Sequence, residues 1–237
     1  MNLKVLTSNC LIVTLIVSLG EVYGQKKIDL EVKRTADFEL TGDGLSSSWG
    51  KAEWFTLTKR KGAATYQTRA KLLYSDTGIY GVFDCSDKKI TATLKEDFAD
   101  LWKEDVVEIF FWTHESTPLY FEYELSPLNH ELPILVPNFG GDFFGWRPWH
   151  YDEDARKTRH VTKVIKDDKG NVTSWVGEFF IPYALLKPLQ NVPPKSGTTW
   201  RVNLYRNDYD EGQSSWSWQP IQTNFHDFER FGTIRFE

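Results

Sequence analysis

The chain has 237 residues and a formal net charge of −5, with lysines scattered along it rather than clustered. An acidic balance without a basic patch argues against nucleic acid and anionic membrane surfaces as main partners. Aromatic residues make up 15% of the sequence and include 10 tryptophans, more than one β core usually needs. We therefore expect some of these rings to lie at a binding surface.

The beginning of the chain resembles a secretory signal peptide. Lys4 provides a positive charge, residues 5–19 are mostly apolar, and residues 22–24 resemble a small-residue cleavage site. The apolar run is too short for a spanning helix, so we expect no membrane insertion after cleavage. We predict a signal peptide over residues 1–24, one β domain over residues 25–237, and a secreted or periplasmic location.

The first clear hairpin comprises residues 69–74 and 78–84, joined by a turn that ends at Gly78. A second hairpin follows at residues 105–112 and 120–125, where β-branched and aromatic residues dominate. A period of two places carboxylates among large rings on both of its strands. Since carboxylates accept hydrogen bonds from sugar hydroxyls and rings stack on sugar faces, we expect this hairpin to form half of a carbohydrate-binding surface.

Residues 133–150 combine many rings with the Gly140-Gly141 pair and three prolines, so we expect a long functional loop there. The later segments with strand character are residues 160–166, 172–181, 200–206 and 215–218. Short strands separated by turn residues, with almost no helical periodicity, predict an all-β fold. We expect an antiparallel, jelly-roll-like β-sandwich with long aromatic-rich loops.

Three tryptophans are candidate stacking rings. Trp102 stands at the entrance to a predicted strand, while Trp216 and Trp218 share a face of an extended segment. The alternative for all three is a place in the core. Trp146 and Trp149 of the predicted loop are the next candidates, although rings that pack their own loop explain them slightly better.

Polar strand residues supply candidate hydrogen-bonding groups. Glu108, Glu122, Glu124 and Glu178 all lie beside aromatic residues. A glycoside-active enzyme could use Glu108 with Glu122 or Glu178 as its acid pair, but no spacing here specifies such chemistry.

Asn203 and Arg206 suit vicinal hydroxyls, and the alternative for the arginine-bearing strand is a charge pair across the sheet with Glu178 or Glu124. The turn acids Asp43, Asp84, Asp87 and Asp97 could hold Ca²⁺, but no ladder of ligands specifies a metal site.

Seven stretches in register carry a resemblance to a known family. They are GDGLSSSWGKAEW, AKLLYSDTGIYGVFDCSD, LWKEDVVEIFF, YFEYELSP, SWVGEFFIPYALL, TTWRVNLYR and SSWSW with FHDFERFG. From Leu40 onward the chain resembles the family 9 carbohydrate-binding modules, in the stand-alone form of exported bacterial proteins.

The resemblance implies a β-sandwich that is not an enzyme, binds sugar chains between two tryptophans and often holds structural calcium. By matched position, Trp102 resembles the first stacking ring, Glu108 the carboxylate six residues later and Trp216 the second ring. An arginine expected in the second hairpin strand is replaced by Glu122 and Tyr123, which indicates a different glycan.

We therefore expect non-catalytic binding of polysaccharide or oligosaccharide chains by aromatic stacking and by hydrogen bonds from carboxylates and amides. Glycan-degrading enzymes are possible partners. Two alternatives stay open, a glycoside-active enzyme and a protein-interaction module of the cell envelope.

Overall fold

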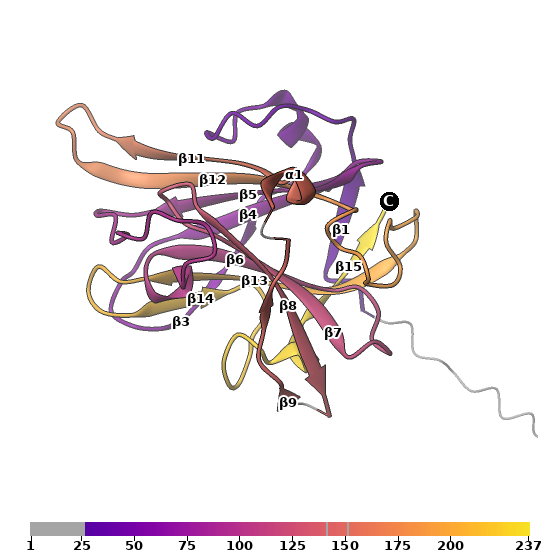
Figure 1. Cartoon of the computed structure of the whole chain (residues 1–237). Coiled ribbons are helices and arrows are strands. Elements are labelled where there is room, and N and C mark those ends of the chain that lie inside the picture. The colour runs from indigo at the N-terminus through magenta and orange to yellow at the C-terminus, as the bar shows by residue number, and fades with distance from the viewer. Residues whose placement is uncertain (1–26, 141, 151) are drawn as a thin grey trace, which may run out of the picture.

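The computed structural model describes residues 27–140, 142–150 and 152–237. The predicted signal peptide, residues 1–24, lies outside the described residues. Strands dominate the described chain and form two layers, which we call sheet A and sheet B (Figure 1). Among the described residues, no helix is both long and apolar enough to span a membrane.

Sheet A contains the second predicted hairpin, and the strands of this sheet named below pair in antiparallel orientation. In spatial order it contains β10 (Arg147–Pro148), β8 (Glu131–Phe139), β7 (Leu119–Leu125), β6 (Val106–Trp112), β13 (Thr199–Asp208) and β15 (Gly232–Phe236). Outside this path, β9 (Asp142–Phe143) pairs with β8, β14 (Ser214–Ser217) with β13, and β3 (Thr58–Lys61) with β14.

Sheet B lies across the core from sheet A. It contains β4 (Thr68–Tyr74), β5 (Gly78–Ser86), β12 (Val172–Pro182) and β11 (Arg159–Lys166), with β2 (Phe55–Thr56) on β4. β1 (Leu30–Arg34) runs parallel to both β15 and β4 and so joins the two sheets. The described helices are short: η1 (Ser47–Lys51), η2 (Leu101–Lys103), α1 (Glu153–Arg156) and η3 (Phe228–Arg230).

Alternation along the strands builds the core between the sheets. Ile109 and Phe111 of β6 point inward and share one buried cluster with Phe179 of β12. The rings of Tyr123 in sheet A and Phe179 in sheet B lie 5.2 Å apart, which places the two sheets face to face. Each fully buried side chain of this size contributes about 1.5–3 kcal/mol. A nearly all-β and mostly antiparallel fold is therefore confirmed, while jelly-roll-like connectivity and long aromatic-rich loops stay predictions.

The predicted loop over residues 133–150 is wrong at its beginning, where β8 continues to Phe139. The carbonyls of Pro133 and Pro137 accept hydrogen bonds from the N–H groups of Trp149 and Phe144, on the side away from β7. In an antiparallel strand the N–H and C=O of one residue point the same way, so the missing proline N–H groups face the sheet edge. Proline is tolerated in a strand at this kind of position.

Candidate functional site

Three glutamate side chains project from the outer face of sheet A. Because Ile109 of β6 points into the core, Glu108 points outward. The register places Glu108 directly opposite Glu124 of β7, and Glu122 opposite Phe110. Cross-strand partners share a face, so the three carboxyl groups gather on one patch of the sheet.

This patch forms part of the lining of a cavity of about 420 Å³. Aromatic side chains supply much of the wall, namely Trp102, Phe143, Trp146 and Phe225. Asn207 and Gln213 add amide groups, and Arg60 and Lys61 add positive charges. The volume and the mixture of rings with a few polar groups are typical of small-ligand sites.

Burial determines the charge state of the cavity lining. It raises the pKa of Glu108 to about 8, although the Nδ2 of Asn207 donates a hydrogen bond of 3.3 Å to its Oε1. Burial raises the pKa values of Glu122 and Glu124 well above their usual range, and Glu108 raises both further. Within the described chain, one oxygen each of Glu122 and Glu124 is buried without a hydrogen-bond partner.

Trp102 combines a fixed backbone with an exposed ring. It belongs to η2, and its carbonyl accepts a hydrogen bond of 2.9 Å from the Tyr209 hydroxyl. Its side chain is nevertheless 43% exposed, while its ring contributes to the cavity wall. Such a ring can stack on a flat apolar face of a ligand.

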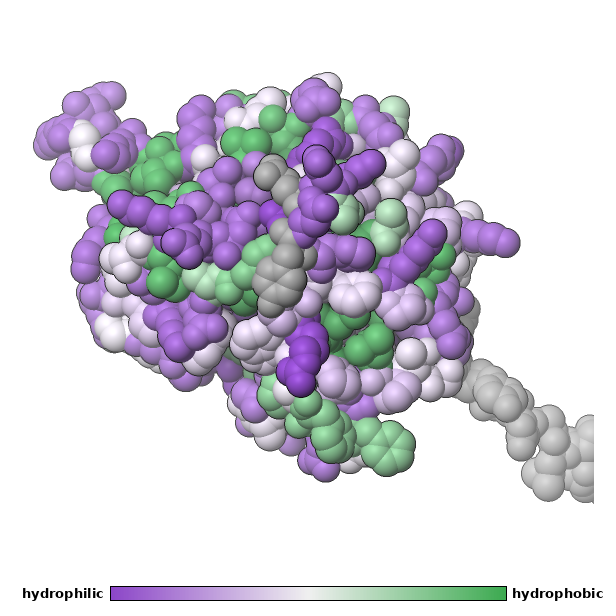
Figure 2. All heavy atoms as spheres, in the orientation of Figure 1, coloured by the Kyte–Doolittle hydropathy of each residue, from purple (hydrophilic) through white to green (hydrophobic). Residues whose placement is uncertain are grey.

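A neutral histidine supports one wall of the cavity. The His226 ring stacks on Phe143 with centroids 4.1 Å apart, and its Nδ1 lies 2.6 Å from the Tyr120 hydroxyl. Burial lowers the pKa of His226 to about 4, so the ring is uncharged at neutral pH. Exposed phenylalanines continue beyond this wall, where hydrophobic atoms gather on the projection formed around β9 (Figure 2). They are Phe139, Phe143 and Phe144.

The structure contradicts the predicted role of Trp216. Trp216 pairs with Arg206 across β13 and β14, and both side chains face the interior. The ring is 1% exposed and lies 5.1 Å from the Arg206 guanidinium, so it cannot stack on a sugar. Trp218 is partly buried against Phe55, with centroids 5.5 Å apart, and does not line the cavity.

The predicted polar ligands Asn203 and Arg206 also lie away from the cavity. Asn203 binds the backbone of Gln219, accepting from its N–H at 2.9 Å and donating to its carbonyl at 3.3 Å. Arg206 is fully buried and donates to Asp87 at 2.9 Å and Asp208 at 2.7 Å. The alternative of an internal charge pair thus describes Arg206 better, although its partners are aspartates.

Glu178 cannot pair with Glu108. It points to the outer face of sheet B, opposite in direction to its core neighbours Gly177 and Phe179. Its carboxylate accepts hydrogen bonds from the N–H groups of Thr41 at 2.9 Å and Gly44 at 2.6 Å. Glu178 therefore fixes a turn on the far side of the molecule.

Sequence reasoning missed the amide groups of the cavity. β13 was expected to end at residue 206 but continues to Asp208, which adds Asn207 to the outward-facing positions. Extending the alternation from Asn203 by two more steps would have found it. Of the two loop tryptophans, Trp146 lines the cavity, whereas Trp149 donates from Nε1 to the carbonyl of Leu185 at 2.8 Å.

A family described as carbohydrate family 9 binding domain-like matches residues 41–237. The chain belongs to this family. No curated protein matches the chain.

Three similar solved structures come from Bacteroides uniformis and Caldicellulosiruptor kristjanssonii. A candidate carbohydrate-binding protein from Bacteroides uniformis has a TM-score of 0.72 and 17% identity, covering 88% of this chain and 98% of its own. A family 9 module from Caldicellulosiruptor kristjanssonii in complex with cellotriose has a TM-score of 0.63 and 15% identity, with coverages of 88% and 93%. The glucose complex of a family 9 module from that organism has a TM-score of 0.60 and 14% identity, with coverages of 87% and 95%. At these identities the likeness shows the shared fold.

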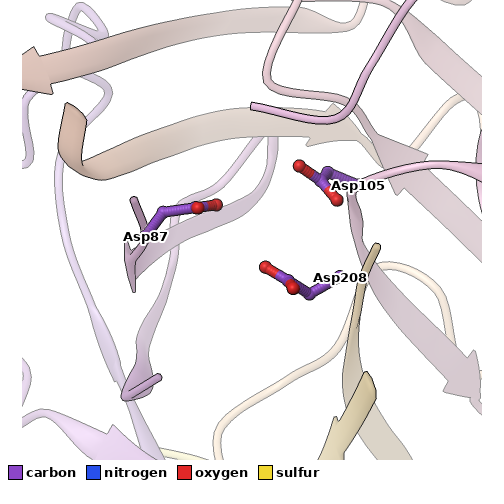
Figure 3. Close-up of side chains that lie close together, drawn as sticks. All are labelled: Asp87, Asp105 and Asp208. Carbon is purple, nitrogen blue, oxygen red and sulfur yellow. The ribbon is translucent and has the colours of Figure 1, made fainter. Parts of the chain in front are cut away.

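A second cluster of acids in this family 9 domain lies between the sheets. Oxygen atoms of Asp87, Asp105 and Asp208 fall within 4.8 Å of one another, and Figure 3 shows the three side chains converging. Arg206 contributes one positive charge to this cluster, and burial raises the pKa values of Asp87 and Asp105 to about 7.

Buried carboxylate oxygens in excess of positive charge are a donor set that fits Ca²⁺. Of the turn acids considered from the sequence, only Asp87 belongs to this cluster. Asp43, Asp84 and Asp97 instead form ion pairs with Lys163, Arg69 and Arg156.

Proposed function

We propose that the cavity on the outer face of sheet A binds polysaccharide or oligosaccharide chains and leaves them chemically unchanged. The observation that carries this proposal is the half-exposed ring of Trp102 beside the buried carboxyl groups of Glu108 and Glu122. A ring presents an apolar face to the C–H surface of a sugar, while carboxyl groups and the Asn207 amide meet its hydroxyls. Membership of a carbohydrate-binding family supports the same conclusion.

The arrangement of the acids favours binding over hydrolysis. Glycosidases place two carboxyl groups on either side of the scissile bond, about 5–10 Å apart depending on mechanism. Here Glu108 and Glu124 are direct cross-strand neighbours, and Glu122 lies two residues before Glu124 on the same face of β7. Groups packed side by side on one floor do not flank a sugar, so we propose that the protein is not an enzyme.

The cluster of Asp87, Asp105 and Asp208 is our proposed calcium site. Each residue comes from the end of a different segment, after β5, before β6 and at the end of β13. A bound Ca²⁺ would supply positive charge to the buried carboxylates and hold these segments together. It would thereby stabilise the fold near the base of the sugar site without contacting the sugar.

We further propose that the protein is exported and acts together with glycan-degrading enzymes. The signal-like residues 1–24 support a secreted or periplasmic location. A module that holds a polysaccharide without cleaving it is useful where another protein performs the cleavage. Fractionation of cells that express the full chain tests the location directly.

Titration calorimetry against a panel of neutral, amino and acidic saccharides tests the sugar-binding proposal. We expect at least one saccharide to bind with a Kd in the micromolar range, about −8 kcal/mol at 1 μM. Trp102→Ala should weaken binding about two- to tenfold, since stacking contributes about 0.5–1.5 kcal/mol.

Trp54→Ala is the matched control, because Trp54 is partly exposed on sheet B beside Arg69 and Lys71. It should leave affinity unchanged. Absence of binding to every saccharide in the panel would contradict the proposal.

A further inference from the structure

The cavity floor is acidic, whereas the positive charges beside it are already engaged. Glu108, Glu122 and Glu124 are all buried and all line the cavity. Arg60 donates to the carbonyl of Thr223 at 3.0 Å, and Lys61 donates to the Oε1 of Gln213 at 2.9 Å. The three carboxyl groups therefore have no cation as a hydrogen-bond partner among the described residues.

Two oxygens on this floor lack a hydrogen-bond partner within the described chain, although the Nδ1 of His226 lies 3.9 Å from one of them. They are the Oε2 atoms of Glu122 and Glu124, whose side chains are 4% and 1% exposed. A buried acceptor left unsatisfied costs about 1–3 kcal/mol, more for a charged group. A ligand that brings several donors to this position would recover that cost.

A cation satisfies this floor better than a neutral group. Carboxyl groups crowded on one patch ionise with difficulty, and burial together with Glu108 raises the pKa values of both Glu122 and Glu124. An ammonium group carries three donors and a charge opposite to that of the ionised acids. Trp102 and Phe225 line the same space, but each ring already has a cation of the chain beside it, Lys103 at 5.1 Å and Arg60 at 5.6 Å from the ring centroids. The preference for an ammonium group therefore depends on the carboxyl groups.

We propose that the cavity selects saccharides that carry a free amine, with the ammonium group seated on Glu122 and Glu124. This inference rests on the proposed sugar-binding function and specifies its ligand class. An N-acetylated sugar offers a neutral amide with one donor in place of the ammonium. A uronic acid carries a carboxylate, which has no donor for the unpartnered oxygens and meets a like charge whenever a carboxyl group of the floor ionises.

Calorimetry with glucosamine and glucose at pH 6.5 tests the inference directly, because the two sugars differ in one substituent. N-acetylglucosamine, glucuronate and spermidine complete the panel. We expect glucosamine to bind at least about tenfold more tightly than glucose, as charge-assisted hydrogen bonds are roughly twice as strong as neutral ones. N-acetylglucosamine and glucuronate should bind no better than glucose.

The double variant Glu122→Gln/Glu124→Gln keeps the shape of the floor and removes its acidity. It should bring glucosamine to the affinity of glucose. Glu39→Gln is the control, because Glu39 is an exposed glutamate that pairs with Arg159 of sheet B. It should preserve the selectivity.

The outcomes separate this inference from the sugar-binding proposal. Glucose binding as tightly as glucosamine to the unmodified protein overturns amine selection and leaves sugar binding intact. That comparison needs no variant, so a misfolded double variant does not affect it. Tight binding of spermidine without binding of any saccharide overturns both proposals.

Discussion

Glu108 of β6 faces Glu124 of β7 across one rung of sheet A, and both side chains are buried. Like charges directly opposite each other destabilise a sheet, so this pair is stable only if protons or a cation neutralise it. Function and stability therefore depend on the same groups. Without a ligand to donate hydrogen bonds, ionising these buried carboxyl groups lowers the stability of the folded protein.

The first prediction is a loss of stability between pH 6.5 and pH 8. The pKa of Glu108 is raised in the folded state to about 8 from the ordinary 4.5. Its stabilising contribution is therefore complete below about pH 4.5 and is lost as pH rises through about 8. His226 has the opposite effect, because its lowered pKa of about 4 makes stability rise with pH up to about 6.5.

Melting curves by circular dichroism check this prediction. We expect Tm to fall from pH 6.5 to pH 8 in the unmodified protein. The fall should be smaller in Glu108→Gln, which has no carboxyl group to ionise at that position. Glu39→Gln, altered at an exposed site, should follow the unmodified protein; equal slopes in all three proteins would show that Glu108 is not the titrating group.

The second prediction separates the two tryptophans that the sequence paired. Trp216→Ala removes a fully buried ring and should lower the free energy of unfolding by about 3–5 kcal/mol. The affinity of the remaining folded protein for sugar should be nearly unchanged. Trp102→Ala should do the reverse, weakening binding with little effect on unfolding. Chemical denaturation and calorimetry on both variants measure the contrast, and a stable Trp216→Ala variant that cannot bind sugar would reverse our assignment.

Trp102 and Trp216 illustrate what strand alternation in the sequence predicts and what it leaves open. Alternation along a strand predicts which residues share a face, and it correctly grouped Glu122 with Glu124 on β7. It does not say which face is buried when both carry rings. The sequence gives both positions the same indole ring. Their surroundings distinguish them, since Trp216 packs on the buried Arg206 whereas Trp102 is 43% exposed beside Lys103.

Prolines and strand ends account for two further errors, the predicted loop over residues 133–150 and the missed Asn207. Because proline has no N–H group to donate, Pro133 and Pro137 indicate a loop unless their nitrogen atoms are known to face a sheet edge. Asn207 was assigned to a loop because the strand was ended at Arg206, although Asn207 pairs with Val106 in the sheet. Both facts depend on which strands are neighbours, and residues distant in sequence decide that.

The third prediction concerns calcium. If Ca²⁺ binds at Asp87, Asp105 and Asp208, removing it with a chelator should lower Tm, and adding Ca²⁺ should restore it. A ligand present at a hundredfold excess over its Kd stabilises the folded state by about 2.7 kcal/mol. Asp105→Asn should abolish the response. Asp84→Asn, which alters a surface pair with Arg69, should retain it; a chelator that leaves Tm unchanged would argue against the metal site.

The fourth prediction tests whether Arg206 is structural. Its guanidinium is fully buried between Asp87 and Asp208, with Thr68 and the carbonyl of Ser86 accepting further hydrogen bonds. Arg206→Met leaves buried acids without their cation, and breaking a buried pair in this way costs about 3–5 kcal/mol. A sugar-contacting arginine would instead reduce affinity with little change in stability.

A double-mutant cycle with Asp208→Asn identifies the cause of the loss. Removing one acid from the Arg206→Met background should recover part of the lost free energy, because less uncompensated charge stays buried. Arg69→Met is the control, since its surface pair with Asp84 is worth only about 0–1 kcal/mol. Denaturation in urea measures all four corners of the cycle. Strictly additive effects would mean that Arg206 stabilises the fold through packing on Trp216 rather than through charge.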